Sequence, residues 1–66
     1  MPVLLRGGPR SRWAYDARGW KQLRESVRTQ LARGQRVVDE VLGYERTNAV
    51  APLPTGEVAS VWRWAR

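Results

Sequence analysis

Apolar side chains recur at helical spacing in the second quarter of the chain. Four of them stand three or four positions apart: Trp20, Leu23, Val27 and Leu31. This spacing puts all four on one face of an α-helix. Asp16 stands just before them as a suitable N-cap, and Gly34 stands where a left-handed C-cap is expected. The pattern predicts an amphipathic helix over residues 17–33.

The C-terminal half changes to the alternation typical of β-strands. Residues 47–51 fit a short strand, residues 52–56 are dense in turn formers, and residues 57–64 alternate between two sets of side chains. This succession indicates a β-hairpin. Residues 35–43 stay open, because their valines fit a short helix ended by Gly43 as well as a strand.

These elements favour an α+β fold, in which one amphipathic N-terminal helix is followed by a small antiparallel sheet. An all-α arrangement of three helices is the alternative, because four C-terminal residues also match one face of a helix. They are Val58, Val61, Trp62 and Ala65.

The first twelve residues show neither the helical period of 3.6 residues nor the strand period of two. Two prolines and two glycines stand among scattered arginines, and these residue types interrupt both helices and strands. We expect residues 1–12 to be a flexible basic arm and residues 13–66 to form a single small domain.

The composition limits what can stabilise such a domain. The chain has 66 residues with no cysteine and no histidine, so disulfides are excluded and the commonest metal ligands are missing. Four tryptophans and two tyrosines are a heavy aromatic load for this length, and each ring buries roughly 150–250 Å². Stability should therefore come from these rings or from association, and a homodimer stays open.

The same absences argue against catalysis. Three serines have no imidazole to activate them. The carboxylates of Asp39 and Glu40 are adjacent in sequence, so they point apart on a helix or a strand. We expect no enzymatic activity, no metal site and no cofactor.

Positive charge is concentrated in the first half of the chain. Residues 1–33 hold eight basic and two acidic side chains, whereas residues 34–66 hold four of each. On the predicted helix, Lys21, Arg24 and Arg28 fall together on one flank of the apolar stripe. Such an asymmetry is typical of a surface that binds a polyanion or an acidic protein. A solvated helix face that binds nothing is the alternative interpretation.

Aromatic residues stand among the arginines near both ends of the chain. Arginine neutralises phosphates and pairs with guanine edges, while aromatic faces stack on unpaired bases. The candidate residues for binding nucleic acid or a partner are Arg10, Arg12, Trp13, Arg18, Lys21, Arg24, Arg28 and Arg63.

Three parts of the chain resemble families that handle nucleic acids. The spacing of residues 34–39, 43 and 56–62 resembles the strand spacing of small SH3-like barrels that bind nucleic acid. Residues 55–59 with 61–66 look like pieces of a MerR-type helix-turn-helix, without the residues that separate its two helices. Residues 15–24 look like the lead-in to phage HNH endonucleases, without the catalytic and zinc-binding residues. The last two resemblances favour DNA over RNA.

We therefore expect a small accessory nucleic-acid-binding protein that contacts phosphates through the basic arm and the helix edge. The alternative is a small phage or bacterial interaction subunit or inhibitor, which docks on a larger acidic protein through tryptophan and arginine residues. The apolar run of residues 3–5 is far shorter than the roughly 20 residues of a membrane span, so we expect a cytoplasmic protein without a membrane partner.

Overall fold

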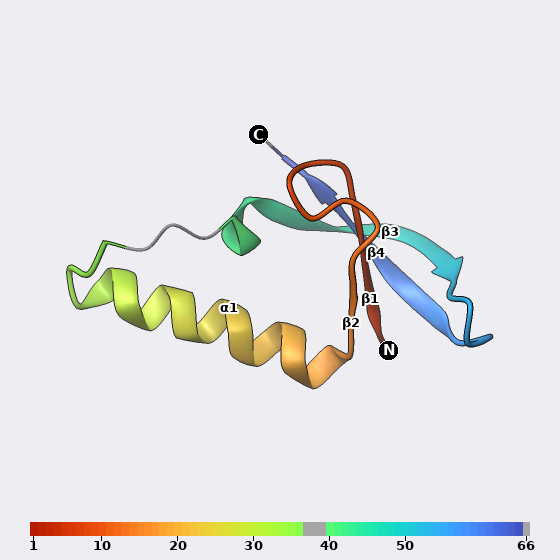
Figure 1. The fold of residues 1–66 in the computed structure, drawn as a ribbon, viewed down its shortest axis with the longest axis horizontal. Helices are drawn as coiled ribbons and strands as arrows, with labels where there is room; N and C mark the ends of the chain where they lie inside the picture. Colours follow the sequence, from red (N-terminus) through yellow and green to blue (C-terminus); the bar gives the residue numbers. More distant parts are fainter. Residues whose placement is uncertain (37–39, 66) are drawn as a thin grey trace.

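The computed structural model of the chain describes residues 1–36 and 40–65 (Figure 1). The elements in chain order are β1 (Val3–Arg6), β2 (Ala14–Tyr15), α1 (Ala17–Ala32), the 3-10 helix η1 (Val41–Gly43), β3 (Tyr44–Pro52) and β4 (Val58–Trp64). One α-helix and one sheet confirm the α+β fold, and the three-helix alternative is wrong. The described part of the chain has no helix long and apolar enough to cross a membrane.

The four strands form one sheet in the order β2-β1-β4-β3. β1 pairs antiparallel with β2, and β3 pairs antiparallel with β4. The central pair, β1 with β4, is parallel, so the prediction of a purely antiparallel sheet is wrong at this position. Parallel pairing requires a long crossover connection, and here α1 lies within it. Two of the strands precede α1 in sequence, whereas we had expected the whole sheet to follow it.

Within the segment expected to be a flexible arm, residues 3–6 form β1. Val3 and Leu5 are buried against α1 and the other strands. A strand of four residues is too short to display a period of two, so its pairing with β4 decides its structure. Arg12, the last residue of the expected arm 1–12, donates its backbone N–H to the Leu5 carbonyl at 2.8 Å.

The ends of α1 follow the predicted caps. The Asp16 carboxylate accepts a hydrogen bond from the Gly19 N–H at 2.5 Å. Gly34 has a φ of +75° and donates to the Leu31 carbonyl, while the Gln35 N–H donates to the Gln30 carbonyl, both at 3.0 Å. This pair of bonds is a Schellman motif. The predicted helix is confirmed, with Arg33 as its C-cap residue.

The predicted hairpin is formed by β3 and β4, and its turn projects away from α1 in Figure 1. Gly56 has a φ of +90° and donates its N–H to the Leu53 carbonyl at 2.9 Å, closing the turn. The register shifts between Arg46 and Val50, which pair with Trp62 and Ser60 respectively. β3 therefore carries a bulge opposite a single residue of β4. Of the open segment 35–43, residues 41–43 form η1, and residues 37–39 lie outside the described residues.

The core lies between α1 and the sheet. Its buried members are Val3, Leu5, Trp20, Val27, Val41 and Tyr44. Leu23 is partly buried beside them, but Leu31 is 49% exposed, so the last position of the predicted stripe is not core. Trp62 and Trp64 are partly buried and pack against this cluster.

All six aromatic residues of the sequence form one connected set. Trp20 contacts the rings of Tyr15, Tyr44 and Trp62, with centroids 5.2, 6.1 and 5.5 Å away. Trp13 joins this set through Tyr15, and Trp64 joins it through Tyr44, with the two ring centroids 5.0 Å apart. The heavy aromatic load is thus used to hold α1 against the strands.

The loop after β1 packs closely against the Trp64 ring. Gly7 and Gly8 have φ values of +76° and +70°. A side chain at Gly8 would place its Cβ 2.5 Å from a ring carbon of Trp64, whereas one at Gly7 would meet only the Trp64 Cβ at 3.6 Å. The glycines that suggested flexibility instead permit a compact loop.

This loop provides a matched test of the fold. Gly7→Ala should lower the unfolding free energy by about 1–2 kcal/mol, because alanine is strained at positive φ. Gly8→Ala should cost about 1–3 kcal/mol more, because the added methyl group also overlaps the Trp64 ring. Urea unfolding followed by tryptophan fluorescence measures both. Unchanged stability in the two variants would mean that these residues are the flexible arm first expected.

Candidate functional site

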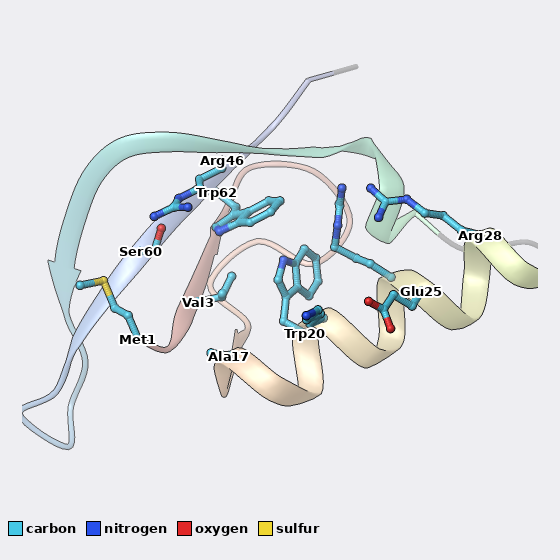
Figure 2. Close-up of a pocket in the computed structure, with 11 residues that line it drawn as sticks. Met1, Val3, Ala17, Trp20, Glu25, Arg28, Arg46, Ser60 and Trp62 are labelled. Carbon is cyan, nitrogen blue, oxygen red and sulfur yellow. The ribbon is translucent and has the colours of Figure 1, made fainter.

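A groove of about 430 Å³ runs between α1 and the sheet (Figure 2). We call it the α1–β4 groove. The residues that matter most for its chemistry are Trp20, Lys21, Arg24 and Arg28 of α1, with Arg46 of β3 and Trp62 of β4. Met1, Val3, Ala17, Glu25 and Ser60 complete its lining. Its volume is within the range of about 300–1,000 Å³ that small-molecule sites occupy.

The lining of this groove is strongly basic. Four cationic side chains face a single carboxylate, that of Glu25. Lys21, Arg28 and Arg46 are exposed, and within residues 1–36 and 40–65 none of the three forms an ion pair. In Figure 2 the Trp62 ring lies between Arg46 on one side and Arg28 on the other. The groove thus presents exposed positive charges around an aromatic side chain.

Arg24 differs from the other three cations because the fold holds it in place. One guanidinium nitrogen donates to the carbonyl oxygens of Val41 at 2.8 Å and Tyr44 at 3.2 Å. The same guanidinium lies 4.9 Å from the ring centroid of Trp62 and 5.7 Å from that of Trp20. Arg24 therefore ties α1 to η1 and the sheet.

The surroundings of Arg24 also disfavour its charge. Burial lowers the pKa of Arg24 below its ordinary value, and the nearby positive charge of Arg28 lowers it further. An anion in the groove would offset both effects by supplying an opposite charge.

The floor of the groove holds a polar group without a partner. Trp20 is 3% exposed, and its Nε1–H makes no hydrogen bond with the described residues. In Figure 2 the nitrogen edge of this indole faces the side of the groove where Val3 and Met1 lie. Buried donors almost always have a partner, so this one calls for an explanation.

The predicted site residues divide into separate groups. Lys21, Arg24 and Arg28 line the α1–β4 groove together, as their helical spacing predicted. Arg18 is exposed on the first turn of α1 and does not line it. Arg63 is exposed on β4, where its guanidinium lies 3.6 Å from the Glu45 carboxylate.

The remaining three predicted residues lie in the loop between β1 and β2. Arg10 donates to the Tyr15 hydroxyl at 2.5 Å and lies over the Trp13 ring at 5.3 Å. Its backbone N–H donates to the Tyr44 hydroxyl at 2.8 Å. Arg12 is exposed with a φ of +72°, and Trp13 is 56% exposed. Arg10 thus anchors this loop to the core, while Arg12 and Trp13 face solvent.

Three of the six residues that matter most for the groove's chemistry were not among the predicted site residues: Trp20, Arg46 and Trp62. Trp20 was predicted only as part of the apolar face of the helix. Arg46 and Trp62 are partners in the β3–β4 register and so stand side by side on the face toward α1. The available signal is that Arg46 stands two residues after Tyr44 on one strand, which puts both on the same face. The pairing partner follows from the bulge and the turn, which the sequence pattern did not define.

The site carries no other recognisable chemistry. Among the described residues, no group of three or more acidic, histidine or cysteine side chains is placed to hold a metal ion. Comparisons with protein-family models, curated proteins and solved structures find no match to the chain. Functional inference therefore depends on the groove itself.

The different roles of the two arginines on α1 can be separated. Arg24→Gln should lower the unfolding free energy by about 2 kcal/mol, because two carbonyl partners and a stacking cation are lost. Arg28→Gln removes the same charge from an exposed position and should change stability by less than about 0.5 kcal/mol. Chemical denaturation measures both. Equal effects of the two substitutions would refute the anchoring role of Arg24.

Proposed function

We propose that this protein binds nucleic acid, with the α1–β4 groove as the contact surface for the phosphate backbone. The observation that carries the proposal is that Lys21, Arg24, Arg28 and Arg46 converge on one groove. Three of these residues lie on α1, whereas Arg46 lies on β3 and is far from them in sequence, so the fold brings the four charges together. DNA is the first candidate among polyanions, as the resemblances of the sequence suggest.

The chemistry of the lining supports a nucleic acid over a simple anion. Lysine and arginine at the rim neutralise phosphates, whereas Trp62 offers an aromatic surface beside them. No catalytic step is proposed. The protein would act as an accessory factor that covers part of a nucleic-acid strand.

Salt dependence provides the test. Each phosphate contact releases counterions and steepens the log–log dependence of affinity on salt by roughly 0.7 on single strands or 0.9 on duplexes. The double variant Lys21→Gln/Arg28→Gln should therefore lose affinity and flatten that slope by about one such increment per residue. Fluorescence anisotropy with labelled oligonucleotides at several salt concentrations measures it. Arg24 is left unchanged because its removal would also disturb the fold.

A matched control removes the same charge elsewhere. Arg33 and Arg36 are exposed and lie outside the groove lining. Arg33→Gln/Arg36→Gln should leave the slope nearly unchanged. Equal slopes for both double variants would show that net charge alone attracts the strand and would remove the groove from the interface. Absence of binding to any oligonucleotide at low salt would favour an acidic protein partner, for which exposed Trp13 and Arg12 are the available anchors.

A further inference from the structure

We propose that the α1–β4 groove holds one unstacked nucleotide, with its base against Trp62 and a base acceptor on the Nε1–H of Trp20. This inference rests on the proposed function and narrows it to single-stranded nucleic acid. It concerns the floor of the groove, whereas backbone binding concerns its basic rim.

The first support is the unpartnered donor. Trp20 Nε1 is buried without a hydrogen-bond partner in the described residues, at a position that lines the groove. An indole N–H can only donate, so the group that completes it must be an acceptor. Every nucleobase carries such acceptors on its edges as carbonyl oxygens or ring nitrogens.

The second support is the arrangement of ring and charge. Trp62 is partly buried, with the Arg24 guanidinium over its ring at 4.9 Å from the centroid, so a base would stack on Trp62 beside Arg24. Arg46 is the direct neighbour of Trp62 in the β3–β4 register. A base stacked there would bring its own phosphate near Arg46 and the next phosphate toward Arg28, which Figure 2 places on the opposite side of the ring. Charge and ring therefore match the two halves of one nucleotide.

The third support is the size and form of the groove. A volume of about 430 Å³ admits one base with its sugar, but a duplex keeps its bases paired and stacked and cannot insert one without unstacking it. Nε1 has almost no accessible surface in the empty groove, so entry of a base requires the lining to adjust. Met1 lines the groove and is 67% exposed, so a shift of its side chain would break few contacts.

The first experiment uses the unaltered protein and three labelled probes of about ten nucleotides. They are a single strand, the same strand with every base removed, and the corresponding duplex. Stacking and one hydrogen bond should make the single strand bind at least about tenfold more tightly than the abasic strand. It should also bind more tightly than the duplex. If the abasic strand or the duplex binds as well as the single strand, the nucleotide site is refuted but the proposed backbone binding survives. If none of the three binds at low salt, both proposals fail.

The second experiment removes the donor and keeps a ring. Trp20→Phe should weaken binding of the single strand about fivefold and leave the abasic strand unaffected. Trp64→Phe is the control, because it also replaces a tryptophan of the aromatic set, but one that lies outside the groove. Equal losses from the two substitutions would refute the role of Nε1. Should Trp20→Phe not fold, the indole N–H resonance of Trp20 decides the question: it should shift when the single strand is added and stay unchanged with the abasic strand.

Discussion

The fold depends on the contacts of one helix residue, Trp20. Its buried ring touches Tyr15 of β2, Tyr44 of β3 and Trp62 of β4, so one side chain joins α1 to three of the four strands. Aromatic pairs contribute about 0.5–1.5 kcal/mol each beyond the burial of their area. A chain of 66 residues without cysteine needs stabilisation of this kind, since its core is small.

The groove is a direct consequence of this packing. Trp20 meets Trp62 edge to face, and both rings line the groove, where the Arg24 guanidinium lies over each of them. Lys21 and Arg28 lie about one turn before and one turn after Arg24 on the same flank of α1, so they extend the positive charge along the rim. The basic groove and the aromatic core therefore share residues, and neither can change without the other.

Local patterns in the sequence predicted the local structure well. The caps at Asp16 and Gly34 defined α1 because they act on neighbouring amides and carbonyls, and the turn at Gly56 defined the hairpin in the same way. The long-range pairings were not predictable. Residues 3–6 became a central strand because β4 lies beside them, and Arg46 entered the groove because the bulge in β3 set its register with Trp62. Three of the eight predicted site residues line the groove, and they are those that helical spacing alone brings together.

Trp20 also carries a polar group that opposes the stability of the fold. A buried N–H without a partner costs about 1–3 kcal/mol, whereas phenylalanine would keep a ring at the centre of the aromatic set without that cost. Stability alone therefore does not explain an indole at this position. Local inconsistencies of this kind are found more often at functional sites than elsewhere, which agrees with the ligand proposed for the groove. The proposed nucleotide would offer an acceptor to the Trp20 N–H and a negative charge to the cations that line the groove.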